Sequence, residues 1–82
     1  MQIKSNSDTL IEIWSQPDCA GCLSAKRMLH SKNIPYTERM LGVDATLEDL
    51  IIKLPGARSV PQIFIDGRHL GGLPELANYL NK

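Results

Sequence analysis

The spacing of apolar and polar positions in the first third of the chain predicts a strand followed by a helix. Residues 10–14 are dense in β-forming side chains, which is typical of a strand. Further on, apolar side chains recur at helical spacing and predict a helix over about residues 20–32. Asp18 or Cys19 is the expected N-cap of this helix, and Asn33 is its expected stop.

The rest of the chain continues with alternating strands and helices. Residues 35–40 alternate apolar and polar positions and predict a second strand. A second helix is predicted over residues 46–54, where Thr46 and Asp49 are placed to form a capping box. This helix ends at a Pro-Gly pair.

The last third predicts a hairpin and a closing helix. Residues 62–65 and 68–70 are short strand segments, and the Asp-Gly pair between them is typical of a two-residue hairpin turn. A Gly-Gly pair ends the second of these strands. Residues 73–80 then predict a helix with Pro74 in its first turn.

The element order is therefore β-α-β-α-β-β-α, which predicts an α/β fold. The first βαβ unit should be parallel with a right-handed crossover, and the hairpin makes the last two strands antiparallel. We expect a four-stranded mixed sheet flanked by three helices. With 82 residues and no repeat, linker or low-complexity segment, residues 1–82 are expected to form one domain.

Composition narrows the function classes. The apolar fraction of 43% is sufficient for a packed core, and the formal net charge of zero gives no general attraction to nucleic acid or to a membrane surface. The sequence contains no run of about 18 apolar residues. The N-terminal stretch is polar and lacks the apolar core of a secretion signal, so a cytoplasmic protein is expected.

The two cysteines of the chain, Cys19 and Cys22, are the candidate reactive groups. Residues three apart on a helix share one face, and Cys19 stands where a helix N-terminus stabilises a thiolate. As a structural staple, so short a loop would contribute only about 2 kcal/mol, against nearly 5 for a hundred-residue loop. Half of a zinc site remains an alternative, as do inert thiols, although His30 and His69 fit no zinc-finger spacing.

Three motifs together resemble one family. A Cys-x-x-Cys pair follows the first strand, Val60-Pro61 stands just before the third strand, and Gly71-Gly72 precedes the last helix. In this order and spacing they resemble the glutaredoxin family, whose fold is thioredoxin-like. The resemblance covers about residues 11–80.

The resemblance implies both a reaction and a binding site. Cys19 would be the nucleophile and Cys22 the resolving thiol of a glutathione-dependent oxidoreductase that reduces protein disulfides and glutathione mixed disulfides. The backbone of Val60 would pair with the cysteinyl part of glutathione, and Pro61 would follow a cis bond. Gly72 and the residues after it would hold the γ-glutamyl end.

The sequence departs from the family's usual pattern around this site. Gln16 stands where glutaredoxins often have lysine, and Ala20-Gly21 replaces Pro-Tyr between the cysteines. Arg58 and Gln62 are candidates to bind the glutathione carboxylate, and Pro74 stands where the family often has an acid or a hydroxyl. Candidate glutathione-binding residues are Gln16, Arg58, Ser59, Val60, Pro61, Gln62, Gly72, Leu73, Pro74 and, for the amino group, Glu75.

Two alternative functions stay open within the family. One is a thioredoxin-like hydrogen donor for ribonucleotide reductase, fed by thioredoxin reductase. The other is a dimer that binds a [2Fe–2S] cluster through Cys19 of each chain and two glutathiones, which the small Ala20 and Gly21 would permit sterically. One thiol per chain is too few for a cluster without such outside ligands. Otherwise we expect a monomer without metal.

Several residues also have a plain structural interpretation. His30 and His69 are expected on the surface, and core packing explains Trp14 as well as a place near the active site does. Arg58 can be a surface cation, and Val60-Pro61 an ordinary loop. Lys26 lies two turns beyond Cys19, roughly 10 Å along the helix, and is expected to affect the Cys19 pKa little.

Overall fold

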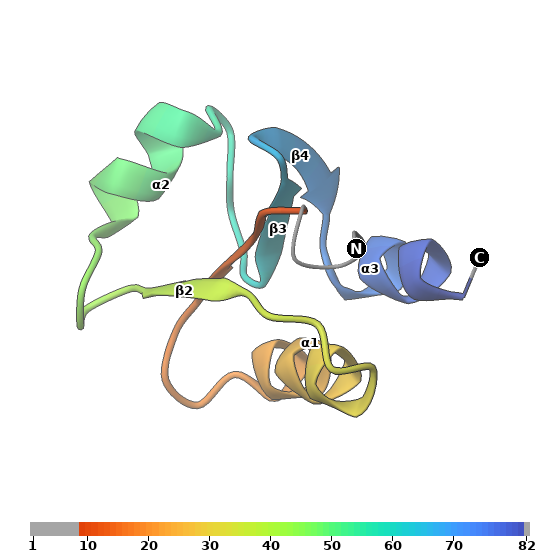
Figure 1. Ribbon diagram of the computed structural model, residues 1–82. Helices are drawn as coiled ribbons and strands as arrows, with labels where there is room; N and C mark the ends of the chain where they lie inside the picture. The colour runs from red at the N-terminus through yellow and green to blue at the C-terminus, as the bar shows by residue number, and fades with distance from the viewer. Residues whose placement is uncertain (1–8, 82) are drawn as a thin grey trace.

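The computed structural model describes residues 9–81 and places a four-stranded mixed sheet between helices (Figure 1). The strand order is β2-β1-β3-β4; β1 and β2 are parallel, and β3 is antiparallel to both β1 and β4. The predicted element order is confirmed. The elements are β1 (Ile11–Ser15), α1 (Ala20–Ser31), β2 (Thr37–Met40), α2 (Leu47–Lys53), β3 (Gln62–Ile65), β4 (Arg68–Gly71) and α3 (Leu73–Leu80).

Side chains along β1 point alternately to the two faces of the sheet, and each face has its own hydrophobic core. Ile11 and Ile13 are buried in a cluster with residues of α1 and α3, whereas Trp14 is buried in a second cluster with Phe64 and Leu50 of α2. Successive strand residues point to opposite faces, so this division follows from the sequence pattern. Figure 1 accordingly shows α1 and α3 together and α2 apart from them. Trp14 is therefore a core residue.

The start and end of α1 depend on two capping residues that the sequence predicted. Cys19 is the N-cap, with an extended backbone. At the other end Asn33 has a φ of 57°, and the N–H of Ile34 donates to the carbonyl of Leu29 at 2.9 Å. This left-handed turn satisfies the last helical carbonyls and ends the helix at Ser31, one residue before the predicted end.

The second strand is shorter than predicted because its pairing with β1 begins late. Register pairs start at Glu12 with Thr37 and end at Ser15 with Met40, so Pro35 and Tyr36 lie outside the strand. The same pairing extends β1 to Ser15, one residue beyond the predicted strand, and Ser15 is completely buried.

The predicted turn and cap in the second half of the chain are confirmed. Asp66 and Gly67 both have positive φ, 52° and 84°, as a two-residue hairpin requires. The Thr46 hydroxyl accepts the Asp49 N–H at 3.0 Å, while the Asp49 carboxylate accepts the Thr46 N–H at 2.9 Å. The helix itself runs from residue 47 to 53, and β4 continues to Gly71, one residue beyond the prediction.

No helix within residues 9–81 is both long and apolar enough to span a bilayer. The polar N-terminal segment, residues 1–8, in which we expect no secretion signal, lies outside the described residues.

Candidate active site

Cys19 stands at the first turn of α1, where the chain leaves β1. Its sulfur accepts the backbone N–H of Cys22 at 3.1 Å, and its carbonyl accepts the N–H of Leu23 at 3.1 Å. The first turn contains no acidic side chain, although Asp18 directly precedes it. A thiolate at this sulfur would gain a hydrogen bond and the positive end of the helix dipole. This local geometry is what the sequence predicted.

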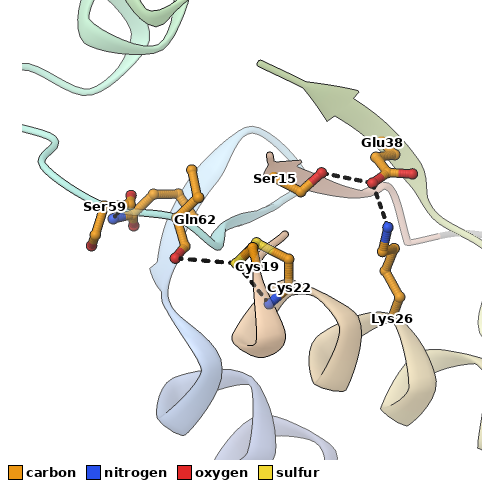
Figure 2. Close-up of a disulfide and its surroundings, with 8 residues drawn as sticks. Ser15, Cys19, Cys22, Lys26, Glu38, Ser59 and Gln62 are labelled. Atoms are coloured by element: carbon orange, nitrogen blue, oxygen red, sulfur yellow. Dashed lines mark hydrogen bonds and ion pairs between the residues drawn. A yellow bond between two sulfur atoms is a disulfide. The ribbon is translucent and has the colours of Figure 1, made fainter. Parts of the chain in front are cut away.

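The two sulfurs form a disulfide, and their exposures differ (Figure 2). Cys22 is 1% exposed and packed inside α1, whereas Cys19 is partly exposed at the helix end. A substrate sulfur can therefore reach Cys19 and not Cys22. This asymmetry matches the roles of nucleophile and resolving thiol.

A backbone edge faces the Cys19 sulfur. The carbonyl oxygen of Val60 lies 3.7 Å from Sγ of Cys19, and the Val60–Pro61 bond is cis, as predicted. A disulfide sulfur carries no proton, so this is a contact here; a reduced Cys19 thiol has the proton to donate. Gly21 brings the helix close to this edge, because a Cβ placed on it would lie 3.3 Å from Pro61 Cδ.

The start of α3 borders the same edge. A Cβ placed on Gly72 would lie 3.3 Å from the Pro61 carbonyl oxygen. Gly72, Pro61 and Val60 therefore form one continuous backbone surface beside Cys19. Leu73 and Pro74 follow as the first residues of α3, and Pro74 has no N–H with which to bind an anion at this helix end.

Glu75 caps α3 from within its first turn. Its Oε1 accepts the backbone N–H of Gly72 at 2.8 Å and so caps α3. The side chain folds back over Gly71, where a Cβ would lie only 2.6 Å from Glu75 Cγ. Glycine is required at this position, because its φ is also 137°. That Glu75 binds a ligand amino group stays a prediction: the helix cap uses Oε1, and a carboxylate has further acceptor sites for such a ligand.

Three of the remaining candidate residues lie in or beside the loop before β3. Arg58 and Ser59 are exposed, and the Gln62 side chain donates to the Ser59 carbonyl at 2.9 Å. Gln62 also accepts from His69 at 2.7 Å, so its amide is already bonded on both sides. One N–H of the Gln62 amide remains for a ligand carboxylate.

Gln16 is separate from this group. It lines a groove of about 550 Å³ between the active-site loop, α1 and β2, and neither Val60 nor Pro61 contributes to that groove. Val60, Pro61 and Gly72 thus lie on one side of Cys19, and Gln16 lies in the groove, which does not include Val60 or Pro61. Both cysteines also line this groove, together with Pro17, Asp18, Ala20, Leu23, Lys26 and Met40.

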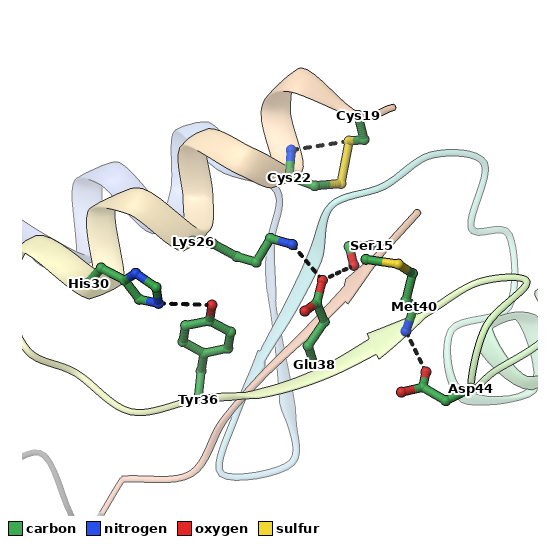
Figure 3. A network of polar contacts seen from close by, with 9 residues as sticks. All are labelled: Ser15, Cys19, Cys22, Lys26, His30, Tyr36, Glu38, Met40 and Asp44. Carbon is green, nitrogen blue, oxygen red and sulfur yellow. Dashed lines mark hydrogen bonds and ion pairs between the residues drawn. A yellow bond between two sulfur atoms is a disulfide. The ribbon is translucent and has the colours of Figure 1, made fainter. Parts of the chain in front are cut away.

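Beneath the disulfide lies a network of polar side chains (Figure 3). This network was not predicted from the sequence. Oε2 of Glu38 accepts from Lys26 Nζ at 2.7 Å and from the buried Ser15 hydroxyl at 2.6 Å. These hydrogen bonds, the one from Lys26 first, hold the pKa of Glu38 below its ordinary value. Lys26 lies one helical turn after Cys22 and lines the same groove.

The histidines lie on the surface, as expected. His30 contacts the Tyr36 hydroxyl at 3.2 Å, and His69 contacts Gln62. Within residues 9–81, no three His, Cys, Asp or Glu side chains are grouped as metal ligands would be.

A thioredoxin-like sheet with an exposed cysteine and a buried one at the start of its first helix defines the class of thiol–disulfide oxidoreductases. Within that class, the family model described as Glutaredoxin matches residues 11–70. The chain belongs to the glutaredoxin family, which implies thiol–disulfide oxidoreductase activity.

Individual relatives agree with this assignment. The chain is 38% identical over 66 residues to glutaredoxin 3 of Escherichia coli, covering 80% of each chain. It is 41% identical over 69 residues to a hybrid peroxiredoxin of Haemophilus influenzae, covering 84% of this chain and only 28% of that longer protein. Among solved structures, glutaredoxin 1 of Francisella tularensis superposes with a TM-score of 0.72 at 29% identity, covering 90% of this chain and 99% of the other.

Proposed function

We propose that this protein is a glutathione-dependent oxidoreductase that reduces protein disulfides and glutathione mixed disulfides. The observation that carries the proposal is the position of the Cys19 sulfur, at the start of α1 and 3.7 Å from the Val60 carbonyl. An extended thiol-bearing peptide can pair with the Val60 backbone as one more strand does, and so bring its sulfur to Cys19. Membership of the glutaredoxin family supports glutathione as that peptide.

In the proposed reaction, the reduced dithiol supplies two electrons. The Cys19 thiolate attacks one sulfur of the substrate disulfide; a Cys19–substrate bond forms, and the other substrate sulfur leaves as a thiolate that takes up a proton. The Cys22 thiol then loses its proton and attacks Cys19. The second substrate thiol is released, and the Cys19–Cys22 disulfide seen here is formed.

Two glutathione molecules complete the cycle. The first attacks Cys19, which forms a Cys19–glutathione disulfide and returns Cys22 to its thiol. The second attacks the glutathione sulfur of that mixed disulfide and leaves as glutathione disulfide. A substrate that is itself a glutathione mixed disulfide needs only Cys19.

Three features of the site support recognition of the glutathione tripeptide. The backbone of Val60 offers polar groups beside the sulfur, Gly72 leaves the neighbouring space free of a side chain, and the exposed Arg58 offers a cation to a carboxylate. Two features weaken binding of the γ-glutamyl end of glutathione. Pro74 lacks an N–H, and Oε1 of Glu75 is engaged in capping α3. We therefore expect a higher KM for glutathione substrates than a site with a free N–H at residue 74 would give.

The test is a coupled assay with glutathione, glutathione reductase and NADPH on a glutathionylated peptide and on a protein disulfide. Cys19→Ser should be inactive on both substrates. Cys22→Ser should keep activity on the glutathionylated peptide and lose it on the protein disulfide. Activity of Cys19→Ser, or turnover by thioredoxin reductase in place of glutathione, would overturn the proposal.

One relative supports a candidate for the protein substrate. The matching hybrid peroxiredoxin carries a segment like this chain within a longer protein. We propose that this domain reduces an oxidised peroxiredoxin. Peroxide consumption that requires both proteins and glutathione would support this, and a rate unchanged by Cys19→Ser would refute it.

A further inference from the structure

A chain of hydrogen bonds connects His69, on the edge strand, to the loop that faces Cys19. Nε2 of His69 lies 2.7 Å from Oε1 of Gln62, and Nε2 of Gln62 donates to the Ser59 carbonyl at 2.9 Å. Ser59 immediately precedes Val60. The chain therefore starts outside the active site and ends one residue from it.

The chemistry of the partners fixes the direction of every bond in this chain. A carbonyl oxygen only accepts, so the Gln62 amide must present its NH₂ group to Ser59. Its oxygen must then face His69, and Nε2 of His69 must carry a proton in order to donate. Without that donor, the Gln62 amide can rotate, and a flipped amide would place its oxygen against the Ser59 carbonyl.

The His69 ring is held in place by Phe64. The two ring centroids are 5.2 Å apart with planes tilted by 49°, and Phe64 itself is 4% exposed. The ammonium of Lys53, on α2, lies 4.7 Å from the centre of the Phe64 ring. The exposed His69 ring, which supplies the donor, therefore packs against the buried ring of Phe64.

Peptide geometry carries the effect to the active site. The Ser59 carbonyl and the Val60 N–H belong to one planar trans unit and point in opposite directions. Fixing the carbonyl towards Gln62 therefore fixes the direction of the Val60 N–H. That N–H is the group that an extended substrate backbone would pair with beside Cys19.

We propose that His69 is a positioning residue for substrate binding, which acts through Gln62 to orient the Val60 N–H. The proposal rests on the function proposed above. It assigns His69 no part in the chemistry of the sulfurs, so loss of the donor should weaken binding and leave the exchange step unchanged.

His69→Phe removes the donor and keeps a ring against Phe64, and His69→Gln restores an N–H donor. In the coupled assay, we expect His69→Phe to raise KM for a glutathionylated peptide about 3- to 10-fold, the effect of one lost hydrogen bond, with kcat within about twofold. His69→Gln should return KM to within about twofold of the wild type. His30→Phe, at the other histidine, is the matched control and should leave both constants unchanged.

A second measurement does not depend on glutathione. Solvent exchange of the Gln62 side-chain proton that is bonded to the Ser59 carbonyl, followed by NMR in the oxidised protein, should be slower in the wild type, His69→Gln and His30→Phe than in His69→Phe. If the wild type fails to turn over the glutathionylated peptide, the proposed function fails and this measurement alone decides the role of His69. Unchanged KM or unchanged exchange in His69→Phe, or the same rise in KM for His69→Phe and His69→Gln, would overturn the proposal.

Discussion

Replacing Lys26 by methionine should destabilise the protein at neutral pH and much less in acid. The Lys26 ammonium donates to Glu38 at 2.7 Å, and the two side chains are 21% and 27% exposed. Methionine keeps most of the alkyl stem and removes the charge. Of the Glu38 partners seen within residues 9–81, the Ser15 hydroxyl then remains.

The expected loss is about 1–2 kcal/mol. A fully exposed ion pair contributes about 0.2–1 kcal/mol, and a hydrogen bond to a charged group about 1.5–3. A pair that is one-quarter exposed should fall between these values. For a chain of this length, total stability is about 4–12 kcal/mol, so the loss is a substantial fraction.

The pH dependence follows from the direction of the Glu38 shift. Its pKa is lowered in the folded protein, chiefly by Lys26, from an ordinary value of 4.5. The carboxylate therefore stabilises the fold above the unfolded pKa, and that contribution disappears as the pH falls through the folded pKa. The stability gap between wild type and Lys26→Met should close over this range. The pKa of Asp49 is also lowered, chiefly by the hydrogen bond from the Thr46 N–H. Asp49 is present in both proteins, so its contribution cancels in the stability difference between them.

Urea unfolding of the oxidised proteins at pH 7 and at pH 3 tests this prediction. With an m value of about 1 kcal/mol/M, the midpoint should shift by about 1–2 M at pH 7 and by less than about half of that at pH 3. Arg27→Met, which removes an exposed cation from the same helix, is the control and should shift neither midpoint. A gap of equal size at both pH values would contradict the argument, because it would come from packing of the stem.

Three further outcomes are expected. Leu29→Ala truncates a side chain that is 0% exposed in the core between α1 and the sheet, and should cost about 3–5 kcal/mol in denaturant unfolding; a cost below about 1 kcal/mol would contradict the packing described. Gly72→Ala places a methyl group 3.3 Å from the Pro61 carbonyl, and should raise KM for a glutathionylated peptide several-fold with little change in unfolding; an unchanged KM would remove Gly72 from the binding surface. Arg58→Gln should raise the same KM about two- to fivefold at low salt and less at high salt, whereas no effect would make Arg58 an ordinary surface cation.

The fold could be predicted from the sequence because its signals are local. The hairpin turn needs only the adjacent Asp66 and Gly67, and the cap of α2 needs only Thr46 and Asp49, which are three residues apart. The position of Cys19 at a helix start likewise depends on its immediate neighbours. Each of these signals lies within one turn of chain, where residue type and spacing are sufficient.

The side-chain partners could not be predicted, because they depend on how strands and helices meet. Ser15 and Lys26 converge on Glu38 only because β1 pairs with β2 in one particular register. His69 reaches Gln62 across the hairpin, next to an irregularity in the pairing of β3 with β4. No pattern in the sequence predicts the register of β1 with β2 or of β3 with β4.

The central claim is that the sulfur of residue 19 is an accessible nucleophile whose negative charge the start of α1 stabilises. Alkylation of the fully reduced protein by iodoacetamide at a series of pH values, with each cysteine followed separately by mass spectrometry, tests it most directly. We expect Cys19 to react first, with a rate whose midpoint lies below the free-thiol pKa of about 8.5, and Cys22 to react far more slowly. A midpoint for Cys19 at or above about 8.5, or faster alkylation of Cys22, would contradict the account.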